Sequence, residues 1–324
     1  MRGPLVSAVL LVDKPAGWTS HDVVGRVRRL VGQREVGHTG TLDPMATGLL
    51  VITLGAATRI GRFLEAEDKT YEATLRLGRS TDTEDADGRT TEARDVPDLS
   101  IEDVRAAAAR FVGEIEQRVP AYSAVRVDGE RLHRKARRGE DVERPVRKIF
   151  VRSLEINSLT REGSEVSVEL ACEVAKGTYV RTLGVDLAAA LLLPGHLTAL
   201  RRTSVGPFAV SAAVKLEEIA REGDSVRGAI STFDALGHLP AISVDGEALA
   251  YVAHGRPLRP DQLHVLRGPF RSGDPLVVAH GRQVVAVAFA ERSSDDLDAA
   301  ASGELDRGLA YACVLIPPPP TEHR

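Results

Sequence analysis

The loop from Gly37 to Gly48, with the sequence GHTGTLDPMATG, holds a single carboxylate, that of Asp43. Pro44 disfavours helical backbone at the residue before it, and glycines at positions 37, 40 and 48 allow backbone geometries closed to other residues. A carboxylate presented in this way can act as a nucleophile. Asp is also common in ordinary turns, so the loop alone leaves both interpretations open. A phosphate-binding loop is excluded, because neither a Gly-Lys-Ser/Thr ending nor a G-x-G-x-x-G opening is present.

Five segments together resemble, in order and spacing, the motifs of the TruB family of tRNA pseudouridine synthases. They are VDKPAGWTS at 12–20, the loop at 37–48, DKTY at 68–71 with TDTEDADG at 81–88, KGTYVRTL at 176–183, and LRRT at 200–203. The resemblance extends to about residue 210 and is weak over the last hundred residues. It implies an α+β pseudouridine synthase fold with a mixed, largely antiparallel central sheet.

The resemblance also implies three catalytic residues. Asp43 corresponds to the nucleophile, and Arg181 to the cation that keeps its carboxylate charged in a desolvated site. Tyr71 corresponds to the tyrosine that stacks on the target base and helps to remove the C5 proton. On residue type alone, Arg181 would be a charge on a helix surface and Tyr71 a core tyrosine.

Further positions match the uridine-binding residues of the family. Tyr179 and Leu200 correspond to residues that line the uridine pocket, and His38 to the histidine that enters the RNA loop when the base flips. Lys14 and Lys69 are expected to support the site or to contact phosphate.

By resemblance the reaction is the isomerisation of uridine 55 in the T loop of tRNA, and it requires no metal and no other cofactor. The substrate partner is therefore the T arm of tRNA. Two alternatives stay open: a tRNA-binding folding factor, and a guide-RNA-dependent pseudouridine synthase. The chain shows no obvious partner-docking extension, which favours standalone action as a monomer.

Charge is distributed unevenly along the chain. The net charge is −4 and the pI about 6.2, which argues against a protein that coats nucleic acid. Residues 126–148, here called the basic segment, nevertheless contain nine Lys or Arg against five Asp or Glu and few apolar residues. We expect a mobile clamp that orders on tRNA, with phosphate contacts from Arg131, Arg134, Lys135, Arg137 and Arg138. The first helix is expected to carry Arg26, Arg28, Arg29 and Arg34, for which a solvated surface is the alternative.

Apolar periodicity predicts mixed helices and strands. Helices are expected at 20–32, where Thr19 and Asp22 approximate a capping box, at 100–113, and after Arg181 through Leu193. Strands are expected at 5–12, 49–54, 71–77, 166–174, 275–279 and 283–289. We expect a catalytic domain at 1–238 and a small C-terminal β-barrel-like domain, similar to a PUA domain, at 239–324; Pro317 to Pro320 would be a stiff tail. The acidic stretch from 291 to 306 is unlike a phosphate-binding surface.

Other features indicate the compartment and exclude further sites. Cys172 and Cys313 have neither disulfide-framework nor metal-ligand spacing, so a reducing cytoplasm is expected. No stretch is long enough to span a membrane, and the apolar start lacks a signal-peptide cleavage site. The acidic cluster at 82–87 fails the calcium-loop register, because Thr83 and Arg94 would occupy ligand positions. It is interpreted as a turn.

Overall fold

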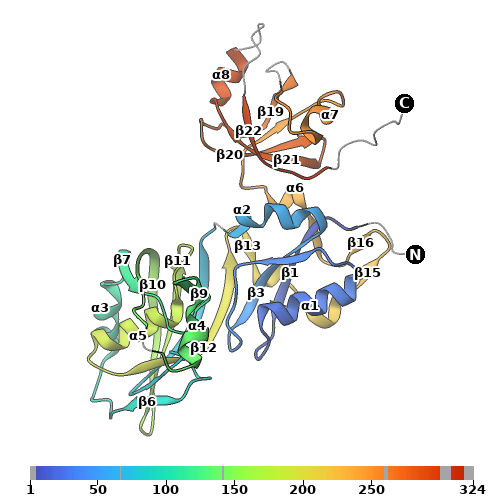
Figure 1. Ribbon diagram of the computed structural model, residues 1–324. Coiled ribbons are helices and arrows are strands. Elements are labelled where there is room, and N and C mark those ends of the chain that lie inside the picture. The colour runs from blue at the N-terminus through green and yellow to red at the C-terminus, as the bar shows by residue number, and fades with distance from the viewer. Residues whose placement is uncertain (1–4, 66, 141, 259–261, 300–307, 317–324) are drawn as a thin grey trace.

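The computed structural model describes residues 5–65, 67–140, 142–258, 262–299 and 308–316 (Figure 1). The α-helices are α1 Ser20–Val31, α2 Gly61–Glu65, α3 Ile101–Ala109, α4 Leu132–Arg137, α5 Val180–Ala190, α6 Thr232–Ala235, α7 Ala248–Ala253 and α8 Ser294–Ala299. Short 3-10 helices are η1 Gly55–Ile60, η2 Val210–Ala212 and η3 Leu216–Glu218. The predicted tail at 317–320 lies outside the described residues.

An 11-stranded sheet forms the body of the molecule. Its main order is β14 Val214–Lys215, β1 Ala8–Lys14, β3 Thr47–Leu54, β12 Gly195–Val205, β4 Lys69–Leu77, β11 Glu165–Val174, β10 Val146–Glu162 and β7 Gly113–Arg118; β2 Val36–Thr39, β13 Phe208–Ala209 and β17 Ala229–Ser231 pair at its sides. In the described part of this sheet, β1 with β14 and β3 with β12 are parallel, and the other pairings are antiparallel. The predicted α+β class with a mixed, largely antiparallel sheet is confirmed.

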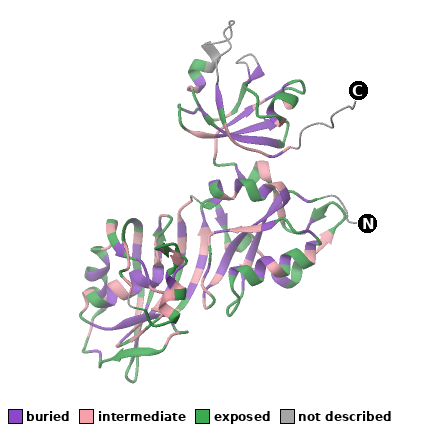
Figure 2. Cartoon of the chain, viewed as in Figure 1, coloured by how far each residue is buried: buried purple, intermediate pink, exposed green. Residues whose placement is uncertain are grey.

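Three two-stranded hairpins project from this body, namely β5 Arg79–Thr81 with β6 Thr90–Ala93, β8 Arg126–Val127 with β9 Glu130–Arg131, and β15 Arg221–Glu222 with β16 Ser225–Val226. Figure 2 shows the central strands largely buried and strand β6 exposed.

Two halves of the sheet meet where β3 pairs with β12, through Thr47 with Arg201 and Gly48 with Arg202. Gly48 has a φ of +97°, and a Cβ there would collide with the backbone oxygen of Arg202. Glycine is therefore required for the two strands to approach, and the close approach places the start of β3 beside β12. The loop that carries Asp43 ends at this junction.

Apolar side chains fill both faces of the sheet. One cluster packs α1, α3 and α5 against β1, β3, β4, β10 and β11. The other packs η1, α2 and α6 against the opposite face of β1 and β3, and continues into the C-terminal sheet. Helices α1 and α5 thus pack into the same apolar cluster on one side of the sheet.

Local signals account for most element ends. Thr19 caps α1, its side chain accepts from Asp22 N, and Gly32 ends the helix in the left-handed region, as predicted. Helix α3 ends at Ala109 rather than near Gly113, because Arg110 and Phe111 form bonds to residues three positions earlier and β7 begins at Gly113. Helix α5 likewise ends at Ala190, short of Leu193.

The C-terminal residues form a separate five-stranded sheet with the order β19 His264–Arg267, β18 Ala241–Ser243, β20 Pro275–His280, β21 Gln283–Ala290 and β22 Leu309–Val314. The predicted strands at 275–279 and 283–289 are both present, and they pair antiparallel. Arg62 of α2 donates to the carbonyl of Ala312 at 2.9 Å, and Phe63 packs near Phe289. The back of α2 therefore contacts this sheet.

Candidate active site

Asp43 and Arg181 form an ion pair between the loop before β3 and the first turn of α5. Arg181 Nη2 donates to Asp43 Oδ1 at 3.3 Å, and Arg181 Nε lies 2.8 Å from Oδ2. The side chain of Arg181 is 4% exposed, whereas that of Asp43 is 34% exposed. The cation is thus buried behind a carboxylate that remains partly exposed.

A second carboxylate holds Arg181 from the other side. Nη1 of Arg181 lies 3.2 Å from Asp85 Oδ2 and also donates to the carbonyl of Thr83, while Nη2 donates to the carbonyl of Tyr122 at 3.2 Å. The side chain of Asp85 is 6% exposed. Arg181 is therefore fixed by partners from three loops, and its planar fork suits such a set better than a lysine would.

The start of α5 is held by a buried glutamine. Gln117 of β7 donates from Nε2 to the carbonyl of Tyr179 at 3.0 Å and accepts from the Tyr179 backbone N–H at 2.9 Å. This paired contact fixes the residue at the N-cap of α5, two positions before Arg181. The orientation of Arg181 thus depends on strand β7 as well as on its own helix.

The loop of Asp43 is held by buried groups of β1 and α1. Lys14 Nζ donates to the carbonyls of Pro15, Trp18 and Pro44 at 2.9, 2.7 and 3.2 Å. Ser20 Oγ donates to the Leu42 carbonyl at 3.2 Å and accepts from its N–H at 2.9 Å. The Lys14 side chain is fully buried, so it supports the loop.

Burial and neighbouring charges act on these groups in opposite directions. Burial raises the pKa of Asp43, and the positive charge of Arg181 opposes that rise. The charge of Asp85 adds to the rise, and that of Lys14 opposes it. Burial lowers the pKa of Lys14 to about 8. A nucleophilic carboxylate here depends on its cationic neighbours to remain ionised.

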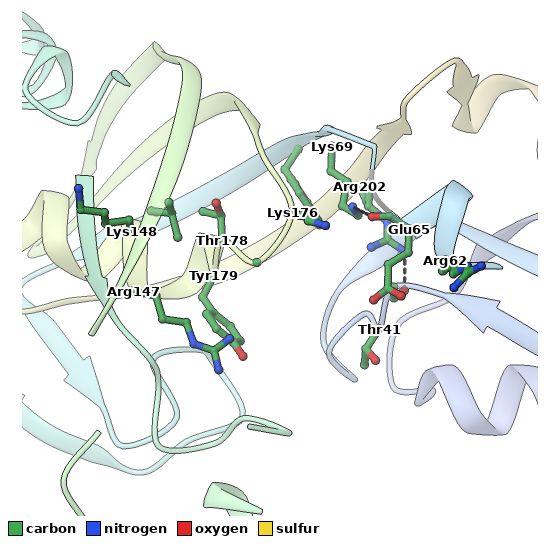
Figure 3. Close-up of a pocket in the computed structure, with 14 residues that line it drawn as sticks. Thr41, Arg62, Glu65, Lys69, Arg147, Lys148, Lys176, Thr178, Tyr179 and Arg202 are labelled. Atoms are coloured by element: carbon green, nitrogen blue, oxygen red, sulfur yellow. Dashed lines mark hydrogen bonds between the residues drawn. The ribbon is translucent and has the colours of Figure 1, made fainter. Parts of the chain in front are cut away.

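An open groove of about 690 Å³ is lined by Thr41 and Tyr179, each two residues before a member of this pair, although neither Asp43 nor Arg181 lines it. Figure 3 shows Lys69, Arg202 and Thr41 on one side, and Arg147 and Tyr179 on the other. Its lining residues are Gly40, Thr41, Arg62, Glu65, Lys69, Tyr71, Arg147, Lys148, Ile149, Lys176, Gly177, Thr178, Tyr179 and Arg202. Six of these carry a positive charge and one a negative charge, so the groove is suited to an anionic ligand with an apolar, aromatic part.

The two tyrosines of the groove have different neighbours. Tyr71 lies in β4 opposite Arg202 in β12, and burial raises the pKa of its hydroxyl while the charge of Arg202 opposes the rise. Arg202 is itself buried, with Nε donating to the Leu49 carbonyl at 2.7 Å and Nη2 to the Gly40 carbonyl at 3.1 Å. Burial also raises the pKa of Tyr179. Both hydroxyls are therefore protonated at neutral pH.

Other predicted residues lie around this centre. Lys69 lines the groove, its ammonium donates to the carbonyls of Glu65 and Glu67, and burial lowers its pKa to about 8. Leu200 is buried opposite Ala73 and lines a neighbouring hollow of about 520 Å³ rather than the groove itself. His38 is half-buried in β2, with its ring 5.7 Å from that of His21, and burial lowers its pKa.

The described part of the basic segment contains a hairpin of β8 and β9 followed by α4. Arg138 pairs with both carboxylate oxygens of Glu130 at 2.7 and 2.8 Å, and Lys135 lies 3.2 Å from Asp128. Within the described residues, the guanidinium groups of Arg131, Arg134 and Arg137 form no hydrogen bond or ion pair. Among the described residues, nothing competes with a ligand for these three cations.

Two groups important in this geometry were not singled out from the sequence. Asp85 was interpreted as part of a turn, and the turn is present: Asp85 Oδ1 accepts from Asp87 N at 3.2 Å. Its other oxygen faces Arg181, and the only sequence signal for this is the motif at 81–88. Arg202 lay inside a quoted motif, but nothing in its spacing indicated that it would be buried beside Tyr71.

Among the residues that the structure describes, no three His, Cys, Asp or Glu side chains are grouped so as to hold a metal ion. No helix in the described ranges is both long and apolar enough to cross a membrane.

Comparison with known sequences identifies two matching regions. Residues 28–180 match the TruB family pseudouridylate synthase N-terminal domain, and residues 181–232 match the tRNA pseudouridylate synthase B C-terminal domain. A tRNA pseudouridine synthase B of Corynebacterium aurimucosum is 40% identical over 304 residues, covering 91% of this chain and 100% of the relative. That of Thermobifida fusca is 49% identical over 222 residues, covering 67% and 76%.

Solved structures give the same result for the fold. A chain of a Cbf5-Nop10-Gar1 complex superposes with a TM-score of 0.73 at 26% identity, covering 96% of this chain and 85% of the other. A chain of an archaeal box H/ACA sRNP Nop10-Cbf5 complex gives 0.71 at 26% identity, covering 96% and 86%.

Proposed function

Because the chain belongs to the TruB family of pseudouridine synthases, we propose that it converts uridine 55 in the T loop of tRNA to pseudouridine. The observation that carries this proposal is the pair of Asp43 and Arg181 beside a cationic groove lined by Tyr71 and Tyr179. A nucleophile, its counter-charge and an aromatic wall are the groups that this isomerisation needs from the protein.

The reaction exchanges one bond of the ribose for another. The carboxylate of Asp43 attacks either C6 of the base or C1′ of the sugar, and the N1–C1′ bond breaks. The base turns so that C5 joins C1′, the bond between Asp43 and the substrate breaks to give back the free carboxylate, the C5 proton is removed, and N1 takes up a proton. No atom is gained or lost, so the protein supplies only a nucleophile, proton transfer and a cavity that retains the base.

Arg181 keeps Asp43 ionised and aimed, since its guanidinium contacts both carboxylate oxygens. Tyr71 stacks on the base with its hydroxyl near C5, Tyr179 provides apolar surface around the flipped uridine, and Leu200 lies in the hollow next to the groove. His38 fills the space that the base leaves in the loop. Flipping costs a few kcal/mol, and less for a loop nucleotide than for one in a duplex.

The groove and the basic segment hold the RNA backbone. Lys69, Lys148 and Lys176 line the groove, and Arg131, Arg134 and Arg137 extend the positive charge along α4. Each phosphate contact releases counterions, so affinity falls as salt rises. The basic segment orders further when the T arm binds.

We further propose that the protein acts without a guide RNA, as a cytoplasmic monomer. Curated relatives at 40–49% identity carry the name tRNA pseudouridine synthase B, whereas the Cbf5 complexes are 26% identical. Both cysteines are free, which suits a reducing compartment.

The test is to incubate the purified protein alone with unmodified tRNA transcripts and to map pseudouridine at nucleotide resolution. Product at position 55, and none in a transcript with cytidine at that position, supports the proposal. A requirement for added RNA would favour the guide-dependent alternative. Accelerated tRNA folding without any product would favour the folding-factor alternative.

A further inference from the structure

An exposed tryptophan lies at the N-terminal end of α1, on a surface that the proposed mechanism does not use. Trp18 is the only tryptophan of the chain and is 36% exposed. It borders two hollows of about 440 and 400 Å³. The first is lined by Gly17, Trp18, His21, Asp22, Gly25 and Arg29, and the second by Pro15, Trp18, Arg26, Arg29, Leu216 and Glu217.

Gly25 keeps the first hollow open. It lies inside α1, where glycine costs roughly 1 kcal/mol relative to alanine. No packing within the protein requires it, because a Cβ at this position would meet no atom within 4 Å and its φ is not positive. A small residue on an exposed helix face, between Trp18 and Arg29, is suited to the close approach of another molecule.

The charges around Trp18 favour an anion. Arg26 and Arg29 are exposed, and within the described residues their guanidinium groups form no hydrogen bond or ion pair. The carboxylate of Asp22 accepts from the backbone and hydroxyl of Thr19 at 2.9 and 2.6 Å, so it is used by the helix cap. Glu217 is the other acid that lines the hollows.

This surface is joined directly to the loop of Asp43. The carbonyl of Trp18 and that of Pro44 accept from the same ammonium, that of Lys14. Gly17 N donates to the Pro44 carbonyl at 2.8 Å. His21, on the wall of the first hollow, packs edge to face against His38. Trp18 thus lies next to the loop that carries Asp43.

We propose that an unpaired base of the RNA loop that carries the target uridine stacks on Trp18, with its flanking phosphates at Arg26 and Arg29. An aromatic face beside cations is the combination that single-stranded nucleic acids recognise. The contact places a second base next to the reacting one, so it contributes to the choice of the loop. This inference rests on the proposed function, because it takes the RNA hairpin as the ligand.

The fluorescence of the single tryptophan reports on this contact without a label. We would titrate the Asp43→Asn variant, which holds RNA without turnover, with a T-arm hairpin while measuring binding by filter retention in parallel. We expect tryptophan quenching that follows the binding curve. In the same background, Trp18→Ala should weaken hairpin binding by roughly 5- to 150-fold, and Trp18→Phe should restore most of it, since stacking needs only an aromatic face.

Controls separate stacking from unfolding and from unrelated effects. Tyr251 of α7 is also exposed, and Tyr251→Ala should leave binding unchanged. Changing Arg26 and Arg29 together to Ser should weaken binding and flatten its dependence on salt. Thermal unfolding should be nearly unaltered in each exposed variant.

The outcomes distinguish this inference from the proposed function. Hairpin binding without quenching, or with Trp18→Ala unaltered in affinity, overturns the stacking contact and leaves the proposed function standing. Quenching by intact tRNA but not by the hairpin also overturns it, because another arm would then be the ligand. Failure of the hairpin to bind at all overturns the proposed function and this inference with it.

Discussion

Because Asp85 is the second carboxylate that contacts Arg181, we predict a measurable effect of the change Asp85→Asn. The amide keeps the size of the side chain and an acceptor for Thr83 and Asp87, so the local turn can persist. The change removes the negative charge that lies 3.2 Å from Arg181 Nη1. Arg181 then keeps Asp43 as its one ionic partner among these groups, and it can rotate away from the geometry seen here.

The size of the effect follows from the contact that is lost. A charge-assisted hydrogen bond contributes roughly 1.5–3 kcal/mol, and about 1.36 kcal/mol corresponds to a tenfold change in rate. If the loss of this free energy weakens the positioning of Arg181 in the transition state by the same amount, the single-turnover rate at saturating tRNA falls by roughly 10- to 150-fold. The affinity for tRNA should change little, because Asp85 is buried behind Arg181.

The assay also has a pH signature. The charge of Asp85 raises the pKa of Asp43, so wherever Arg181 stays on Asp43 the removal of that charge lowers this pKa and moves the acid limb of the rate profile to lower pH. The exposed neighbour Asp87 is the matched control, and Asp87→Asn should behave as the parent. A folded Asp85→Asn protein with a rate within twofold of the parent and an unmoved acid limb would refute the reasoning.

Three further predictions follow from the same geometry. Asp43→Asn should bind tRNA within several-fold of the parent and form no pseudouridine in long single-turnover incubations; near-normal product would remove Asp43 as the nucleophile. Arg181→Lys keeps the charge but loses the planar fork, so the chemical step should slow by orders of magnitude while affinity holds, and a collapse of binding with a normal rate at saturation would make Arg181 a phosphate contact instead. Changing Arg131, Arg134 and Arg137 together to Ser should weaken tRNA binding and reduce its salt slope by about 2–3; the basic segment should also exchange amide hydrogens quickly in free protein and slowly with tRNA, whereas full protection without RNA would identify it as a rigid element.

Local structure was predictable where the signal is local. The cap of α1 depends on Thr19 and Asp22, three residues apart, and the alternation of β4 and β11 follows from which side chains face the core. The ends of α3 and α5 were less predictable. Their last turns form backbone hydrogen bonds between residues three positions apart, and no side-chain pattern in the sequence indicates this change. The assignment of Asp43 and Arg181 came from motif resemblance rather than from periodicity.

Scarcity of apolar residues predicted mobility in the basic segment, but composition does not show which few contacts anchor it. Leu132 is almost fully buried, and the backbone N–H of His133 bonds to the Ser123 carbonyl at 3.1 Å. Arg138 and Lys135, predicted as phosphate contacts, pair in the free protein with Glu130 and Asp128 of the same segment. Phosphate would have to compete with these acids, whereas Arg131, Arg134 and Arg137 can meet it directly.

The contacts at the centre of the site could not be predicted from the sequence, for a physical reason. The contacts of Arg181 with Asp43, Asp85 and Tyr122 join residues separated by 138, 96 and 59 positions, and only the folded sheet brings them together. The interpretation of Asp85 as a turn residue was correct but incomplete. Its Oδ1 accepts a hydrogen bond within the turn, whereas its Oδ2 accepts one from Arg181. A buried arginine needs several acceptors, since an unpaired buried charge costs several kcal/mol. The loop at 83–85 therefore supplies the acceptors that allow Arg181 to remain buried while its remaining edge faces Asp43.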